Sequence, residues 1–240
     1  MRRSLIAVCV AGVGVLGSGA RAATCPAPPG AHPAVAAIDG RQRLAWIDER
    51  LQQQAWRGKL WAYGWGIGVG AAGVGSLIAV PFVAPSQRVD WYTSAATAAF
   101  GVIPFVLAPL KVTRDAPTLR DAIAASPPED DARVCAVLSQ AERMLADDAH
   151  DERWQQAWWT HAGNVAFNAG VLLFLGLGYH HWTSGLVNGL SGVAVGEAII
   201  FTQPTGAIDA AETYNRGELS MRAADARASR SPGWLTAFTF

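Results

Sequence analysis

The distribution of charge along the chain limits its fold more than any other feature. Asp, Glu, Lys and Arg are absent from Leu60 to Gln87, from Trp91 to Leu110 and from Trp154 to Gly196. A helix that crosses a bilayer needs about 20 mainly apolar residues, so these stretches have room for one, one and two spans respectively. The sequence therefore predicts an all-α integral membrane protein with four transmembrane helices.

A duplicated tetrapeptide divides the chain into two similar units. Gln-Gln-Ala-Trp occupies residues 53–56 and again residues 155–158, each time just before an apolar stretch. Apolar residues at helical spacing precede each copy, at 44–55 and at 134–145, which is typical of an amphipathic helix. Because each unit contains an even number of spans, both units enter the membrane from the same side. We expect two tandem parallel helical-hairpin repeats, each preceded by an extracytoplasmic amphipathic helix.

The first residues have the pattern of a secretory signal peptide. Arg2 and Arg3 precede a short apolar run that ends in Ala20-Arg21-Ala22, an A-x-A cleavage pattern. An uncleaved signal anchor is the alternative, and it leaves the remaining topology unchanged. The predicted segments are a signal peptide at 1–22, an extracytoplasmic segment with an amphipathic helix at 23–59, the first transmembrane hairpin at 60–110, a second such extracytoplasmic segment at 111–158, the second hairpin at 159–203 and a polar C-terminal tail at 204–240, which includes a short helix.

The loops between the spans set the expected topology. We expect Arg88 and His180-His181 to lie in the short inner turns, with Asp90 closing the first loop and a further turn at Pro117 in the second polar segment. Export of the N-terminus then places the amphipathic segments and the C-terminus on the extracytoplasmic side of an inner (plasma) membrane. Basic residues such as Lys111 flank spans on that side, against the usual cytoplasmic excess, but long polar segments cross largely regardless of their charge.

Two cysteines remain after the predicted cleavage. Cys9 leaves with the signal peptide, whereas Cys25 and Cys135 both belong to extracytoplasmic segments. An oxidising compartment favours a disulfide between them. Two free thiols are the alternative that the sequence leaves open.

Polar residues inside the predicted spans gather in the second hairpin. His161, Asn164 and Asn168 follow one another at helical steps, and Glu197 is the acidic residue inside a predicted span. Unpaired amides and carboxylates are costly in lipid, so these side chains should face other helices. They form a candidate intramembrane polar site that lines a pathway or holds a ligand, or, as the favoured interpretation, a set of hydrogen bonds across the bundle.

Glycines in the spans are spaced for close helix packing. Small residues four apart allow two backbones to approach in a membrane, where no hydrophobic drive brings helices together. Residues 68–73 also match the dinucleotide-binding glycine pattern, but that pattern requires a strand before a helix, so we expect no cofactor. The glycines predicted to serve helix packing are Gly66, Gly70, Gly185, Gly189, Gly192 and Gly196.

Composition and motifs exclude several classes of function. Lys and Arg number 19, as do Asp and Glu, so no basic excess points to nucleic acid. The motifs supply no catalytic nucleophile–base pair and no metal-ligand set. The sequence favours a non-enzymatic structural, scaffolding or assembly component of the envelope, with the lipid bilayer and further copies or other membrane proteins as partners. The alternative is a small transporter or channel subunit that uses the polar residues of the second hairpin, and a membrane-embedded enzyme ranks third.

Overall fold

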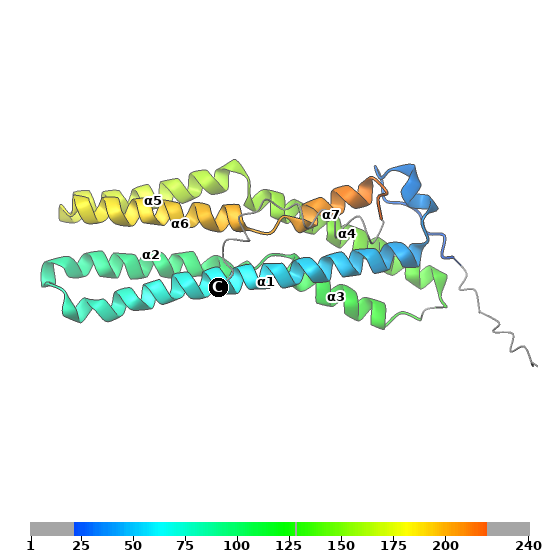
Figure 1. Ribbon diagram of the computed structural model, residues 1–240, viewed down its shortest axis with the longest axis horizontal. Coiled ribbons are helices and arrows are strands. Elements are labelled where there is room, and N and C mark those ends of the chain that lie inside the picture. Colours follow the sequence, from blue (N-terminus) through cyan, green and yellow to red (C-terminus); the bar gives the residue numbers. More distant parts are fainter. Residues whose placement is uncertain (1–21, 128, 220–240) are drawn as a thin grey trace, which may run out of the picture.

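A computed structural model of the chain describes residues 22–127 and 129–219, and the regular elements there are all helices (Figure 1). The predicted all-α class is therefore confirmed for this part of the chain. The predicted signal peptide, apart from Ala22, and the end of the tail lie outside the described residues. The α-helices are α1 Gly40–Ala79, α2 Arg88–Leu107, α3 Val112–Ala124, α4 Asp131–Gln155, α5 Trp158–Tyr179, α6 Trp182–Thr202 and α7 Gly206–Asn215, with short 3-10 helices at Pro33–Ala37, Val80–Phe82 and Pro85–Gln87.

Four helical stretches are long and apolar enough to cross a membrane, as predicted. The apolar part of α1 pairs with α2, and α5 pairs with α6, so the spans form two hairpins. Figure 1 shows the turns of both hairpins at one end of an elongated molecule, with α3, α4 and α7 at the other end. Large apolar side chains such as Ile67 (70% exposed) and Phe201 (74% exposed) cover the outer surfaces of the hairpins. Such surfaces suit contact with lipid.

Helix α1 joins the first amphipathic segment to the first span without a break. It contains 40 residues and is therefore about 60 Å long, twice the thickness of the hydrocarbon core. The Asp39 side chain caps its start by accepting hydrogen bonds from the backbone N–H groups of Arg41 and Gln42. In the second unit the helix breaks instead, because α4 ends at Gln155 and α5 begins at Trp158, with Gln156 and Ala157 between them. The duplicated tetrapeptide thus lies inside a helix in one unit and at a helix break in the other.

The polar segment after the second span contains a helix that the sequence analysis missed. The turn expected at Pro117 is wrong, because α3 runs through this residue. A proline inside a helix removes one backbone hydrogen bond, a loss that the burial of Ala116 and Leu119 can offset. Asp90, expected in a loop, likewise lies in the first turn of α2, where a negative charge favours the helix dipole.

One hydrophobic core holds the helices outside the spans together. We call this part, the first half of α1 with α3, α4 and α7, the extramembrane domain. Its core contains Trp46 and Ile47 of α1, Leu119 of α3, Leu138 of α4 and Tyr214 of α7. Full burial of a large apolar side chain contributes roughly 1.5–3 kcal/mol. The amphipathic faces read from the sequence therefore pack against one another outside the membrane.

Candidate functional site

The four polar residues predicted in the second hairpin come together between α5 and α6. We call His161, Asn164, Asn168 and Glu197 the domain-side polar cluster. His161 Nδ1 lies 2.5 Å from Glu197 Oε2, and Asn164 Nδ2 donates to Glu197 Oε1 at 2.9 Å. Asn164 Nδ2 also reaches the Val193 carbonyl at 3.1 Å, while Asn168 Nδ2 donates to the Asn164 side chain at 2.9 Å. The polar groups thus bind one another across the hairpin.

The cluster extends from the domain end of α5 to about the middle of that helix. His161 lies in the first turn of α5, and Glu197 lies near the end of α6. Asn168 is ten residues after Trp158, which places it about 15 Å along the helix, half the thickness of the hydrocarbon core. It is 5% exposed. The length of the cluster along α5 is therefore comparable to the thickness of one leaflet.

Two predicted packing glycines make room for the asparagines. A Cβ atom at Gly192 would collide with the Asn168 side-chain amide, and one at Gly196 would collide with the Asn164 amide. Helix α6 can approach α5 with these amides between them only because both positions lack side chains. The packing glycines of α6 and the asparagines of α5 thus belong to one helix–helix interface.

The remaining predicted glycines differ in how closely they pack. A Cβ at Gly185 would lie 2.8 Å from the Leu172 carbonyl oxygen, and a Cβ at Gly189 would lie 3.1 Å from that of Asn168. Helix α6 therefore contacts the backbone of α5. In the first hairpin, Gly66 and Gly70 make ordinary contacts with the side chains of Phe105 and Val102. The tight approach there occurs at Gly73, where a Cβ would lie 2.9 Å from Ala98 Cβ.

A second polar cluster links the two hairpins near their turns, and the sequence analysis did not predict it. We call Asp90, Ser94, His181, Ser184 and Asn188 the turn-side polar cluster. Asp90 Oδ1 lies 2.8 Å from His181 Nδ1, and Asp90 Oδ2 accepts from Ser184 Oγ at 2.8 Å. Ser94 Oγ donates to Asn188 Oδ1 at 2.5 Å. The i, i+4 spacing of Asp90 with Ser94 and of Ser184 with Asn188 is the signal that could have found it.

The two polar clusters lie on opposite flanks of α6. Asn188 and Glu197 are nine residues apart, which is about 180° around a helix with 3.6 residues per turn. On the turn side of Asn168, the α5–α6 contact is made by Leu172 and the fully buried Leu175 against α6 glycines. The two clusters therefore do not join into one polar path along the contact between α5 and α6.

The buried guanidinium of Arg43 connects several elements of the extramembrane domain. The Arg43 side chain is 0% exposed, and its Nε donates to the Tyr214 hydroxyl at 2.8 Å. Its guanidinium also donates to the carbonyls of Cys25 and Pro26 and pairs with the Glu142 carboxylate, to which the Tyr214 hydroxyl donates as well. Burial, with the Glu142 hydrogen bond, raises the pKa of Tyr214. These contacts join α1, α4, α7 and the segment before α1.

Two buried carboxyl groups lie on one face of α4. Glu152 Oε2 accepts hydrogen bonds from the backbone N–H groups of Ala207 (2.9 Å) and Ile208 (3.1 Å), so it caps the start of α7. Burial raises the pKa of Glu152 to about 8. Asp148 is 1% exposed, and burial together with the neighbouring Asp115 carboxyl raises its pKa to about 8. Within the residues that the structure describes, neither Asp148 oxygen accepts a hydrogen bond, which adds to the cost of burying its charged form.

The predicted cysteine pair meets at the end of the extramembrane domain. Cys25 and Cys135 form a disulfide with a Cα–Cα distance of 5.3 Å, which ties the segment before α1 to α4. Gly40, the first residue of α1, packs against it, since a Cβ there would lie 2.5 Å from Cys25 Sγ. The bridge closes a loop with a sequence separation of 110 residues, so it constrains the unfolded chain strongly.

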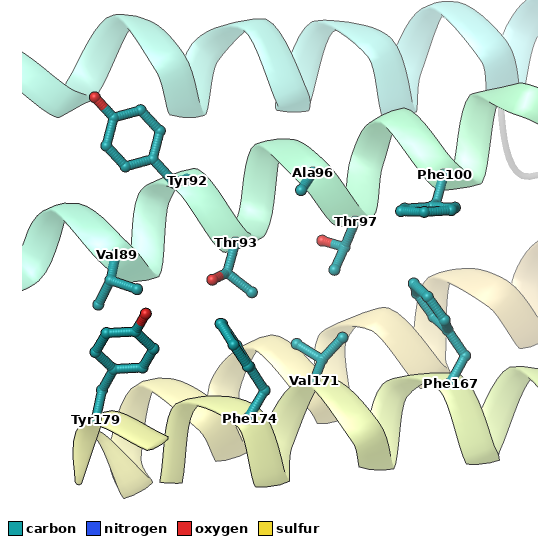
Figure 2. Close-up of a pocket in the computed structure, with 10 residues that line it drawn as sticks. All are labelled: Val89, Tyr92, Thr93, Ala96, Thr97, Phe100, Phe167, Val171, Phe174 and Tyr179. Carbon is teal, nitrogen blue, oxygen red and sulfur yellow. The ribbon is translucent and has the colours of Figure 1, made fainter. Parts of the chain in front are cut away.

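An apolar groove separates α2 of the first hairpin from α5 of the second. We call it the inter-hairpin groove, and its volume is about 510 Å³. Figure 2 shows it running from Val89 and Tyr179 to Phe100 and Phe167, with the side chains of Thr93 and Thr97 directed toward α5. The rings of Phe100 and Phe167 lie 5.8 Å apart and are the aromatic contact between the two walls.

The order of the groups in the turn-side polar cluster differs from that of an activated serine. In the turn-side cluster Asp90 lies between Ser184 and His181, whereas activation of a serine needs the base next to the hydroxyl. Among residues 22–127 and 129–219, no three His, Cys, Asp or Glu side chains are grouped to hold a metal ion. The chain matches no protein-family model, no curated protein and no solved structure.

Proposed function

We propose that this chain is a non-enzymatic scaffold of the inner membrane that holds its extramembrane domain in a fixed position at the extracytoplasmic surface. The observation that carries this proposal is the continuity of α1, which belongs both to the core of the domain and to the first hairpin. A continuous helix about 60 Å long resists bending more than a loop does. Motion of the domain is thereby coupled to motion of the spans.

Contacts between the hairpins at the membrane surface support this role. Trp61 Nε1 donates to the Ile199 carbonyl at 3.2 Å, and Trp65 Nε1 donates to Thr202 Oγ1 at 2.9 Å. Both bonds connect α1 to the end of α6, directly below the domain, while Asp90 and His181 connect α2 to α6 at the other end. The two hairpins are therefore tied together at both ends, as a rigid support requires.

The proposed topology follows from the same features. Each hairpin begins and ends on the side of the extramembrane domain (Figure 1), which agrees with two parallel repeats. A disulfide persists in an oxidising compartment, so the Cys25–Cys135 bridge favours the extracytoplasmic side for the domain. The partners proposed for the scaffold are further copies of the chain or other membrane proteins.

The alternative, a small transporter or channel subunit, is favoured by one observation. His161 and Glu197 form an ion pair, if the histidine is protonated, within a candidate span. The closed bonding of the cluster and its end at Asn168 support the structural role instead, because conduction needs a path across the whole bilayer.

Two variants separate these functions. A short glycine segment inserted after Trp56 interrupts α1, whereas Glu197→Gln removes a charge without changing the shape of the side chain. For a scaffold, the insertion reduces the amount of native-membrane complex seen in blue native electrophoresis, and Glu197→Gln leaves it unchanged. The opposite result would be a proton or cation flux in proteoliposomes that Glu197→Gln abolishes, with the complex intact in both variants. That result would contradict the scaffold function and favour the transporter.

A further inference from the structure

The inter-hairpin groove lies wholly within the apolar part of the molecule. Its walls come from α2 and α5, which belong to different hairpins, so neither hairpin fills it (Figure 2). The contact between Phe100 and Phe167 marks its inner end. Val89 and Phe100 are eleven residues apart on α2, so the groove follows about 16 Å of this helix. This length matches one leaflet, which is half of a hydrocarbon core about 30 Å thick.

Neither water nor empty space is a favourable occupant of this groove. Its lining is aromatic and aliphatic apart from hydroxyl groups, and Thr97 Oγ1 already donates to the Ser94 carbonyl of its own helix at 2.9 Å. Water needs two or more polar partners in a cavity, and apolar cavities stay dry. An empty groove would forfeit the dispersion contacts of the phenylalanine rings. A lipid hydrocarbon chain needs no hydrogen bonds and makes the dispersion contacts with the phenylalanine rings that an empty groove would lack.

Basic residues stand at the mouth of the groove. Arg88 precedes the lining residue Val89, and His180 follows the lining residue Tyr179, and both are exposed at the turn end. Within residues 22–127 and 129–219, no carboxylate forms an ion pair with Arg88. A guanidinium at the membrane surface attracts an anionic headgroup.

We propose that the inter-hairpin groove binds one acyl chain of an anionic phospholipid, taken from the leaflet at the turn end, with the phosphate of its headgroup near Arg88. The site is distinct from the annular lipid around the hairpins because α2 and α5 enclose the chain on two sides. Its occupant would also complete the packing between the hairpins. This inference does not depend on whether the protein is a scaffold.

Native mass spectrometry of the detergent-purified full chain tests the site with two probes, phosphatidylglycerol and phosphatidylcholine of identical acyl chains. Ala96→Trp places an indole in the groove and should remove the retained lipid, whereas Val74→Trp, on the exposed surface of α1, should not. Arg88→Gln should reduce the preference for phosphatidylglycerol about five-fold, the value of one basic residue at a membrane surface. Arg57→Gln, an exposed arginine near the middle of α1 and away from the turn end, is the matched control.

A measurement on the unaltered protein covers the case in which Ala96→Trp does not fold. Phosphatidylglycerol with a photoreactive diazirine halfway along one acyl chain should form adducts at Thr97 and Phe167 more often than at Val74. Adducts spread evenly over all exposed spans, or lipid retention equal in Ala96→Trp and Val74→Trp, would overturn the proposal. Crosslinks from the groove to another protein chain in place of lipid would also overturn it.

Discussion

Replacement of Asp148 by asparagine should change how the stability of the extramembrane domain depends on pH. The Asp148 carboxyl is buried beside Asp115, and its pKa is raised to about 8 from an ordinary value near 4. The unfolded chain releases this proton above about pH 4, whereas the folded chain keeps it until about pH 8. Between these values the folded state binds more protons, so the free energy of unfolding falls as the pH rises.

The expected magnitude follows from this difference. Each such group lowers the free energy of unfolding by about 1.4 kcal/mol per pH unit. Glu152, whose pKa burial also raises to about 8, adds a second group of the same sign. Between pH 5 and pH 7 the wild type should therefore lose about 5 kcal/mol, and Asp148→Asn about half of that. Below about pH 4 the full extra stability is present, and above about pH 8 it has been lost.

Urea unfolding of the full chain in detergent, followed by the fluorescence of Trp46, measures this slope. Trp46 is 2% exposed in the core of the domain, and a Trp46→Phe variant identifies its signal among the other tryptophans. Asp147→Asn is the matched control, because the Asp147 side chain is a neighbour on α4 but is 63% exposed. A wild-type stability that is constant or rises from pH 5 to pH 7, or an unchanged slope in Asp148→Asn, would refute the reasoning.

Three further changes test other contacts. Gly192→Val displaces the Asn168 amide and should destabilise the second hairpin by about 1–3 kcal/mol in detergent unfolding, with part of the loss restored by Asn168→Ala in the same chain. Glu152→Ala removes the cap of α7, worth about 1 kcal/mol, and should speed proteolysis within that helix, whereas equal cleavage rates would contradict the assignment. Replacing Cys25 and Cys135 by serine should lower domain stability by about 2–4 kcal/mol, and a reductant should reproduce this loss in the wild type but have no effect on the double variant.

The spans could be predicted because hydrocarbon excludes charge. The gaps between charged residues locate all four candidate membrane helices, and a helical repeat of 3.6 places His161, Asn164 and Asn168 on one face. Which residues they meet depends on how α6 is rotated against α5, a property of tertiary packing. The contact with Glu197 and the glycine pockets that hold the asparagines therefore became visible only in the structure.

Other features depend on contacts that a linear pattern does not contain. The tetrapeptide Gln-Gln-Ala-Trp continues a helix in α1 but marks a break between α4 and α5, where Trp154 packs against Trp159 with ring centroids 4.6 Å apart. Sequence reasoning places an arginine on the surface, yet Arg43 is buried because four partners satisfy its donors. Local sequence sets helix propensity, whereas tertiary partners decide breaks and buried charges.

The continuity of α1 between domain and membrane is the claim on which the proposed function depends most. Spin labels at cysteines introduced in place of Ala45 and Ala72, both exposed, report it directly by double electron–electron resonance in proteoliposomes. The labelled positions are 27 residues apart, so an unbroken helix predicts one narrow distance distribution centred near about 40 Å. A broad or shorter distribution, like that expected of the variant with glycines inserted after Trp56, would show a hinge and contradict the scaffold.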